Sequence, residues 1–262
     1  MLLKRIYNKL RFNRLNLLKT IYINFRFFDF KQALKFPILI YGPTVFNFHK
    51  GCCIKICNQI KRGMIKIGIS DPFRSYKSYS LIELKGELEI EENIIIRRGI
   101  RIFLDTNAKL KLRNNVFISD NTNIYCMQYI KIGTNTIIGN NCSFMDSDLH
   151  FILDRKTRVI KNSNKPVIIG SNNWISGWSV VKKGAETPEG TILAGPYSMI
   201  GKDYINKIPP YSIIGGNPAK LIKEEKRIIS NKKQQSELYH YYKINTVDYM
   251  VDPSIDEDKF CI

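Results

Sequence analysis

The stretch from Asp146 to Trp174 reads DSDLH at residues 146–150, then a polar break at residues 151–166, then VIIGSNNW at residues 167–174. On both sides of it an aliphatic residue recurs every six positions, and inside it the count fails. A strict repeat tolerates a break at little cost only where a loop can leave the repeating structure, and such loops often carry function. The stretch therefore predicts a repeat fold and marks its candidate functional loop.

The six-residue period runs through most of the chain after residue 80. It begins with nine positions, eight of them aliphatic: Ile82, Leu88, Ile94, Ile100, Thr106, Leu112, Ile118, Ile124 and Ile130. After a shift of two residues it continues at Ile132, Ile138 and Phe144, and a strict count places His150 at the next inward position. Beyond the break it resumes at Ile169, Ile175, Val181, Thr187, Leu193, Met199 and Ile205.

A period of six predicts an all-β prism of short parallel strands, because it fits neither the helical period of 3.6 nor the strand period of 2. Each strand supplies one inward aliphatic side chain, and three faces make a coil of about 18 residues, with coils about 4.8 Å apart. Corners need residues that tolerate the left-handed conformation. Asparagines are dense at the expected corners: Asn93, Asn114, Asn115, Asn121, Asn123, Asn135, Asn140, Asn141, Asn172 and Asn173. A β-sandwich would instead show hairpin turns every 8–12 residues or so, a spacing that this sequence lacks.

Five segments are expected along the chain. Residues 1–42 form a basic amphipathic helical segment, and residues 43–81 form an irregular entry to the β-helix. Residues 82–214 form the β-helix domain, with a loop at residues 151–166. Residues 215–244 hold a C-terminal helix, about Leu221 to Tyr242, that packs along the stack or caps it. Residues 245–262 form an acidic tail with little to order it.

The chain is strongly basic, with a net charge of +18. Residues 1–40 carry nine Lys or Arg against one acid, Asp29, whereas the last 19 residues have a net charge of −4. This balance favours polyanionic partners: nucleic acid, anionic lipid, an acidic glycan or a phosphorylated cofactor. For the N-terminal segment two interpretations stay open. It packs on the main domain or a partner subunit, or it lies on the inner face of a membrane as a peripheral helix.

The sequence shows neither a membrane span nor a metal site. Its apolar runs fall short of the roughly 18–20 residues of a span, and the N-terminus lacks the features of a signal peptide. Its six cysteines match no zinc spacing, so no metal is expected. These features favour a cytoplasmic protein with reduced thiols.

Three motifs carry a family resemblance: IGSNNWI at residues 169–175, IPPYS at residues 208–212 and GNPAK at residues 216–220. They resemble the closing part of hexapeptide-repeat acyltransferases, and DSDLH at residues 146–150 resembles the catalytic histidine segment of that superfamily. Within it, residues 80–225 are most similar to maltose/galactoside-type O-acetyltransferases and to those of capsule and O-antigen loci. The resemblance implies a left-handed parallel β-helix, an exception to right-handed crossovers. It also implies a homotrimer, acetyl-CoA as donor, and active sites between subunits.

The resemblance also implies the catalytic residues. His150 is the expected general base, because an imidazole that titrates near neutrality can take the proton of an attacking hydroxyl. Asp146 or Asp148 is expected to orient its ring, although either carboxylate alternatively forms a turn. Trp174 is expected to line the channel for the acetyl group and the pantetheine arm, although a surface or interface aromatic is the alternative.

Further residues are expected to contact the coenzyme. A main-chain N–H near Ser176 or Gly177 is the candidate donor to the oxyanion. The resemblance places the pantetheine arm near Gly195, where Pro196 removes one N–H donor. Lysines on the C-terminal coils either bind the coenzyme phosphates or are solvated surface charges: Lys182, Lys183, Lys202 and Lys220.

These features favour an acetyl-CoA-dependent O-acetyltransferase that acts on a bacterial surface glycan, such as a capsule or O-antigen chain with an acidic sugar like sialic acid. Two alternatives stay open. One is an N-acetyltransferase on an amino sugar, or a drug-acetylating relative. The other is a non-catalytic basic binding module, whose case rests on charge alone. A nucleic-acid partner is not expected, because the positive charge is not accompanied by a motif that combines basic residues with aromatic residues for base stacking.

Overall fold

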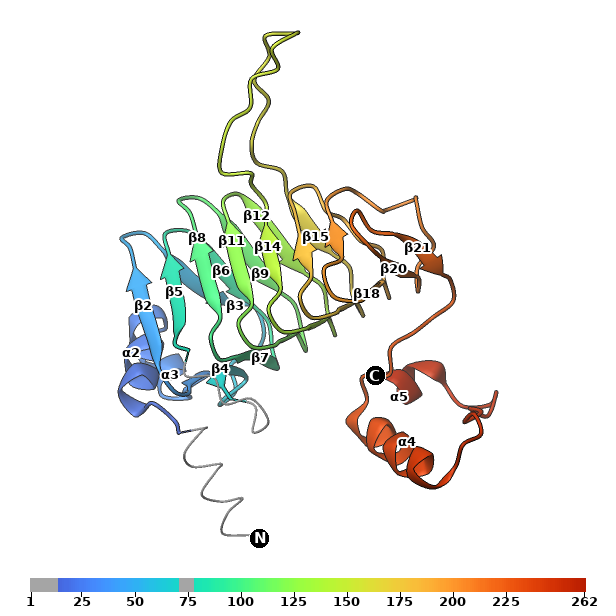
Figure 1. Cartoon of the computed structure of the whole chain (residues 1–262). Helices are drawn as coiled ribbons and strands as arrows, with labels where there is room; N and C mark the ends of the chain where they lie inside the picture. The colour runs from blue at the N-terminus through green and yellow to red at the C-terminus, as the bar shows by residue number, and fades with distance from the viewer. Residues whose placement is uncertain (1–13, 71–77) are drawn as a thin grey trace.

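The computed structural model of the chain describes residues 14–70 and 78–262. Its body is a three-sided prism of short strands, with helices near both ends (Figure 1). Within the described residues every strand pair is parallel except β20 with β21. The chain winds around three sheets in turn, so the parallel prism predicted from the six-residue period is confirmed.

The strands are assigned to three faces. Face 1 consists of β1 (Ile38–Ile40), β4 (Ile65–Ile69), β7 (Ile94–Arg97), β10 (Phe117–Ile118), β13 (Ile137–Ile138), β16 (Trp174–Ile175), β18 (Ile192–Ala194), β20 (Ile213–Gly215) and β21 (Lys220–Lys223). Face 2 consists of β2 (Thr44–Phe48), β5 (Ser80–Leu84), β8 (Arg101–Leu104), β11 (Asn123–Cys126), β14 (Ser143–Met145), β17 (Val180–Val181) and β19 (Met199–Ile200). Face 3 consists of β3 (Cys53–Ile56), β6 (Glu87–Ile90), β9 (Lys109–Leu112), β12 (Tyr129–Ile132) and β15 (Val167–Ile169).

The core is a set of aliphatic ladders inside the prism. On face 1 the register stacks six buried residues in successive coils: Ile96, Ile118, Ile138, Ile175, Leu193 and Ile214. Each such side chain contributes about 1.5–3 kcal/mol by leaving water. The eight aliphatic residues between Ile82 and Ile130 that set the period are also buried.

Apart from His150, three positions of the six-residue count are not inward. Thr106 is exposed because it lies in a turn whose next residue, Asn107, has a φ of 62°. Near the C-terminal end Ile200 is buried instead of Met199, and Ile205 is exposed. The turn at residues 195–197 adds a residue there, so the count fails.

Left-handed asparagines form the corners. Where face 3 passes to face 1, Asn93, Asn115, Asn135 and Asn172 have φ values between 55° and 59°. Their side chains also form a ladder, in which each Nδ2 donates to the Oδ1 of the next asparagine at 2.8–3.0 Å. Asn121 and Asn141 are left-handed where face 1 passes to face 2, whereas Asn123 lies in β11.

The coil begins much earlier than the sequence pattern indicated. β1 lies within the predicted helical segment 1–42, and β2, β3 and β4 lie within the predicted irregular entry 43–81. These strands pair in register with the later coils, as Thr44 does with Ser80. Long connections follow β3 and β4, so the six-residue count is not visible in the sequence. The expected helix over residues 1–13 lies outside the described residues.

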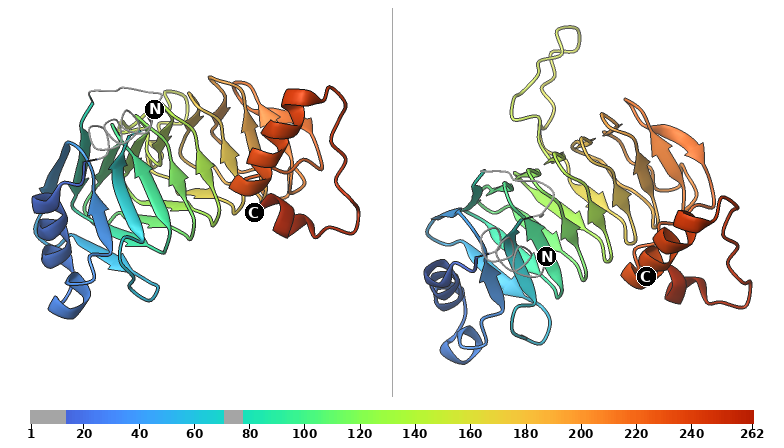
Figure 2. Two further views of the ribbon diagram at one scale, coloured as in Figure 1. Left: turned by 90° about the horizontal axis from the view of Figure 1, so that it is seen from below. Right: turned by 60° about the horizontal axis from the view of Figure 1, so that its bottom comes forward.

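Helix α2 (Leu17–Phe27) covers the open edge of β1, and α3 (Phe30–Ala33) follows it (Figure 2). The Asn24 side chain accepts a hydrogen bond from the Ile38 N–H at 3.1 Å and donates to the Ile38 carbonyl at 2.7 Å. Thr20 Oγ1 accepts the Ile40 N–H at 3.0 Å, and the Asn16 N–H donates to the Ile40 carbonyl. The polar groups of an unpaired strand edge are therefore satisfied by a helix.

The C-terminal segment differs from the expected helix over Leu221–Tyr242. Residues 220–223 form β21, which pairs antiparallel with β20, and α4 (Lys232–Ile244) begins only after Asn231, whose side chain caps it. The predicted acidic tail also contains α5 (Glu257–Cys261), with Phe260 and Cys261 buried. The Arg227 guanidinium donates to Asp258 at 2.5 Å, which draws this tail back to the chain. Throughout residues 14–70 and 78–262, each helix is too short or too polar to cross a bilayer.

Replacing Asn24 tests the role of α2. We expect Asn24→Ala to lower the free energy of unfolding by about 2–4 kcal/mol, because the buried N–H and C=O of Ile38 both lose a partner. Denaturant unfolding followed by circular dichroism measures this loss. Asn47→Ala, at an exposed position of β2, is the matched control. Equal stability of the two variants would show that the β1 edge does not depend on α2.

Candidate active site

The coil breaks after β14, where residues 147–164 leave the stack as a long arm (Figure 1). Antiparallel bridges join Ser147 to Asn164 and Leu153 to Ile160. The arm therefore begins before the predicted loop at residues 151–166. It exposes six large apolar side chains: Leu149, Phe151, Ile152, Leu153, Val159 and Ile160.

His150 lies on the arm and is exposed, so the strict count that placed it inward is wrong. The arm leaves the stack before residue 150, and no inward position remains for its imidazole. The ring lines a groove of about 330 Å³ between the arm and the coil, together with Asp148, Ile152, Ser163 and Lys183. The imidazole is therefore open to an incoming molecule.

Asp146 anchors the start of the arm. It is fully buried, and its carboxylate accepts the main-chain N–H groups of Met127 at 2.7 Å, Gln128 at 2.8 Å and Tyr129 at 2.6 Å. Both oxygens are thus committed to the turn between β11 and β12. This carboxylate sets the direction in which the arm leaves the coil.

Asp148 shares the groove with His150, as does Asp154. Its Oδ2 lies 2.5 Å from the Lys183 ammonium, which follows β17 in the next coil. Across residues 14–70 and 78–262, His150 forms no hydrogen bond with Asp146 or Asp148. Within a single chain, neither of the two predicted carboxylates therefore orients the imidazole through a hydrogen bond.

Trp174 lies on a different side of the prism from His150. It opens β16 on face 1, in register with Ile137 and Ile192, and its side chain is 39% exposed on the outer surface. His150 follows β14, at the corner between faces 2 and 3. One chain does not bring these two predicted site residues together.

The predicted coenzyme residues Ser176, Gly177 and Gly195 gather at the corner between faces 1 and 2. The Ser176 hydroxyl donates to the Gly195 carbonyl at 2.7 Å, which joins two successive coils. The Ser176 N–H donates to the Leu193 carbonyl at 3.0 Å. Of the two candidate oxyanion donors, Gly177 therefore remains.

Two large aromatic residues occupy left-handed positions at this corner. Trp178 has a φ of 64° and Tyr197 a φ of 61°, where Asn121 and Asn141 stand in earlier coils. Their rings are exposed, with centroids 6.2 Å apart. A bulky residue in this conformation costs backbone energy, and such strain gathers at functional sites. Sequence reasoning missed Tyr197, and the departure from asparagine at the corner is the signal that would have found it.

The four predicted phosphate-binding lysines are spread over the C-terminal coils. Lys182 and Lys202 are exposed beyond β17 and β19, and the Lys202 ammonium lies 5.2 Å from the centroid of the Tyr204 ring. Lys183 is paired with Asp148, and exposed Lys220 begins β21 on face 1. Lys182, Lys183 and Lys202 share the corner between faces 2 and 3 with the base of the arm.

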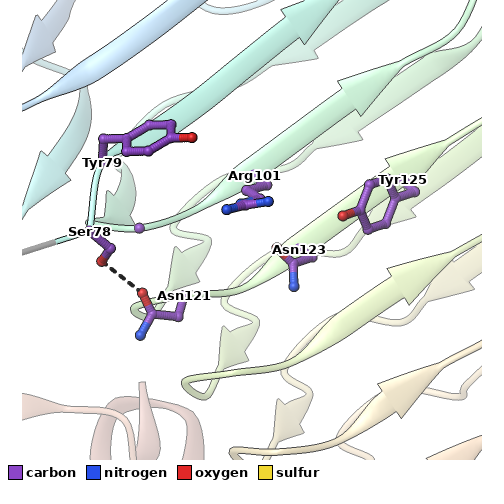
Figure 3. Close-up of a pocket in the computed structure, with 7 residues that line it drawn as sticks. Ser78, Tyr79, Arg101, Asn121, Asn123 and Tyr125 are labelled. Atoms are coloured by element: carbon purple, nitrogen blue, oxygen red, sulfur yellow. Dashed lines mark hydrogen bonds between the residues drawn. The ribbon is translucent and has the colours of Figure 1, made fainter. Parts of the chain in front are cut away.

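A second groove, also of about 330 Å³, crosses the outer surface of face 2 and was not predicted (Figure 3). The Arg101 guanidinium lies between the rings of Tyr79 and Tyr125, with Asn123 beside it. In the described part of the chain Arg101 has no carboxylate partner. A cation, amides and aromatic rings in one groove suit a saccharide that carries an acidic group.

Comparisons with known proteins identify the family. No family model matches the chain. A protein of Staphylococcus aureus (strain Mu50), provisionally named an acetyltransferase, is 34% identical over an alignment of 147 positions, which covers 46% of this chain and 71% of the relative. The chain belongs to the hexapeptide-repeat acyltransferases. It is therefore a transferase enzyme, as the sequence predicted.

Two further likenesses accompany this one. A protein of Escherichia coli (strain K12), provisionally named the colanic acid biosynthesis acetyltransferase WcaF, is 26% identical over 144 residues, which cover 55% of this chain and 72% of the relative. Among solved structures, the polySia-specific acetyltransferase NeuO is similar with a TM-score of 0.47 and 20% identity, over 79% of this chain and 99% of that one.

The cysteines nearest the arm of this acyltransferase are poor nucleophiles. Burial, followed by the charge of Asp146, raises the pKa of the Cys126 thiol far above its usual range. Burial raises the pKa of Cys142 to about 11. A covalent acyl-cysteine would need a thiolate. Among the described residues, moreover, no group of three or more His, Cys, Asp or Glu side chains converges as metal ligands do.

Substitutions of Asp146 and Asp148 distinguish a carboxylate that anchors the arm from one that forms a surface ion pair. We expect Asp146→Asn to lower the free energy of unfolding by about 2–3 kcal/mol, because an amide group replaces an acceptor oxygen that faces main-chain N–H donors. Asp148→Asn removes only a partly exposed ion pair and should cost about 0–1 kcal/mol. Denaturant unfolding measures both. Equal losses would contradict the anchoring role of Asp146.

Proposed function

We propose that this acyltransferase moves an acetyl group from acetyl-CoA to a hydroxyl of an acidic bacterial surface glycan, a capsule or O-antigen chain. The observation that carries the proposal is the position of His150 in a member of this family. It is an exposed imidazole at the break of the coil, and it lines a groove with Asp148 and Lys183. The colanic acid name of the Escherichia coli relative supports an acceptor of this class.

His150 supplies general-base catalysis in this proposal. Its imidazole takes the proton of the acceptor hydroxyl as the oxygen attacks the thioester carbonyl, and the C–S bond then breaks. The imidazolium returns that proton to the departing thiolate, so the enzyme ends unchanged. The Gly177 N–H is the proposed donor to the oxyanion. Transfer is direct, which accords with the raised thiol pKa values of Cys126 and Cys142.

A complete site requires two copies of the chain. His150 and Trp174 lie on different sides of the prism, and the arm exposes six large apolar side chains that a second subunit would cover. We therefore propose a homotrimer of left-handed coils, in which the arm of one subunit meets face 1 of its neighbour. A cyclic arrangement of this kind forms three equivalent sites.

The coenzyme is proposed to follow the C-terminal coils from Trp174. Ser176, Gly177 and Gly195 form the corner beside its thioester arm, and the exposed rings of Trp178 and Tyr197 form the wall next to them. Lys182, Lys202 and Lys220 are exposed and supply charge for the phosphates. The Lys183 ammonium is already paired with Asp148, so only part of its charge is available to the phosphates.

The acceptor is proposed to lie across face 2, on the N-terminal side of the arm. Arg101 on β8 is in register with Asn123 on β11, and Tyr125 is in register with Met145, which directly precedes Asp146. β8 is two strands from β14, so the groove lies about 10 Å from the coil that carries the arm. A glycan chain can span that distance and place its carboxylate at Arg101.

We further propose a cytoplasmic location. All six cysteines of the chain lie among the described residues, and all are free thiols. Exposed and half-buried thiols such as Cys57 and Cys52 persist in a reducing compartment.

His150→Ala is the direct test of the mechanism. We expect turnover to fall by about 10²–10⁴-fold with the oligomer intact, which is the usual size of an acid–base contribution. Thiol release from acetyl-CoA, measured with acidic and neutral capsule polysaccharides, gives the rates, and His240→Ala on α4 is the control. Unchanged turnover in His150→Ala removes the imidazole from the mechanism. If thiol is released with amino sugars but with no glycan, N-acetyl transfer replaces O-acetyl transfer as the proposed reaction. If no acceptor causes thiol release, the result favours a non-catalytic binding module.

Arg101→Gln tests the acceptor groove. We expect the KM for an acidic glycan to rise about tenfold with kcat preserved, because one charge-assisted hydrogen bond is lost. The KM for acetyl-CoA should not change. Arg113→Gln on the neighbouring face, where Arg113 pairs with Glu91 at 2.8 Å, is the matched control. A drop in kcat without a change in KM would contradict a binding role.

A further inference from the structure

Helix α2 has apolar side chains on its outward side as well as on the side that packs on the coil. The residues that it buries against the coil are Thr20, Ile23 and Asn24, of which Thr20 and Asn24 hold the edge of β1 through hydrogen bonds. A second apolar side faces outward, although the outward side of a surface helix is normally polar. The outward side is therefore not explained by the stability of the coil.

This outward surface, here called the end-cap face, extends over both N-terminal helices. Its exposed members are Leu17, Leu18, Ile21, Tyr22 and Phe25 on α2, with Phe30 and Leu34 on or after α3. Leu18 is 81% exposed and Phe30 is 68% exposed. The rings of Phe25 and Phe30 are 5.9 Å apart, which joins the two helices into one patch. A contiguous apolar patch of this kind marks an interaction site, whereas apolar residues scattered singly over a surface do not.

The charges around the end-cap face are mostly positive. Residues 14–35 contain five cations, Arg14, Lys19, Arg26, Lys31 and Lys35, against a single acid, for a net charge of +4. That acid, Asp29, already accepts the Gln32 N–H at 3.0 Å as the cap of α3. The Lys19 ammonium donates inward to the Thr44 carbonyl, and the remaining cations are exposed. The patch therefore fits an apolar surface that carries negative charge.

We propose that the end-cap face docks on a lipid bilayer with anionic headgroups. Outward apolar side chains among cations are the pattern of an interfacial helix, whose apolar side enters the acyl boundary while its cations meet the headgroups. Pairing of two copies through the same face would bring two such positive rims together, which opposes self-association. This inference stands without the proposed transferase activity, because it uses none of the site residues.

Docking in this way fixes the orientation of the whole prism. The end-cap face closes the first coil, so the coil axis stands away from the lipid surface (Figure 1). The arm follows β14 in the fifth coil, about 20 Å from the first at the usual strand spacing. The grooves that contain Arg101 and His150 are then held above the bilayer and not against it.

Co-sedimentation of the full chain with vesicles tests the proposal. The vesicles contain phosphatidylcholine with about 30% phosphatidylglycerol, and pure phosphatidylcholine vesicles are the uncharged control. We expect the wild-type chain to bind the anionic vesicles at least about tenfold more strongly than the neutral ones, and to be released at high salt. Leu18→Glu with Phe30→Glu should weaken anionic binding by about tenfold or more, since it removes apolar area and adds negative charge.

A matched control variant and a measurement of the oligomeric state distinguish lipid binding from other roles of the end-cap face. Ile244→Glu changes an equally exposed apolar residue on α4 and should leave vesicle binding unchanged. Equal loss in both variants, or no sedimentation of the wild-type chain with anionic vesicles, would overturn the proposal. A smaller oligomer for Leu18→Glu with Phe30→Glu in light scattering would show that the face is a subunit contact, and would also overturn it. Circular dichroism confirms that the double variant is folded.

Discussion

Each coil of this acyltransferase must turn three corners within a few residues, and that constraint shapes everything else. The left-handed asparagines meet it on one corner, where Asn93, Asn115, Asn135 and Asn172 share a hydrogen-bonded ladder. With corners fixed and inward positions filled by aliphatic residues, the chain can vary only in outward side chains and in segments that leave at a corner. The arm is such a segment, and buried Asp146 sets where it leaves.

A stack of parallel strands also leaves a hydrogen-bonding edge at each end, and the two ends are closed differently. At the C-terminal end the chain folds β21 back antiparallel on β20. At the N-terminal end the side chains of Thr20 and Asn24 replace a strand. The second solution buries Thr20, Ile23 and Asn24 of α2, and the outward side of that helix is apolar as well. The same device that closes the fold thus provides the surface proposed to meet a membrane.

The repeat, its core and many of its corners could be predicted because they depend on local periodicity. The first coils could not, since the connections after β3 and β4 interrupt the count. The roles within the candidate site were also hidden. The three N–H donors that occupy Asp146, and the carbonyl that occupies the Ser176 N–H, come from other coils and leave no trace in the local sequence. Likewise Phe260 is buried where Arg227, Ser230 and Asn231 hold the acidic tail through hydrogen bonds, and these partners lie about 30 residues before it in the chain.

In the proposed trimer, one active site takes His150 from one subunit and Trp174 from its neighbour. Mixed oligomers test it most directly. His150→Ala and Trp174→Ala chains, each inactive alone, are unfolded, combined in equal amounts and refolded together, and thiol release is measured. We expect recovery of about one quarter of wild-type activity, because random assembly of a cyclic trimer pairs an intact His150 with an intact Trp174 at that share of interfaces. A mixture as inactive as either variant alone would contradict it.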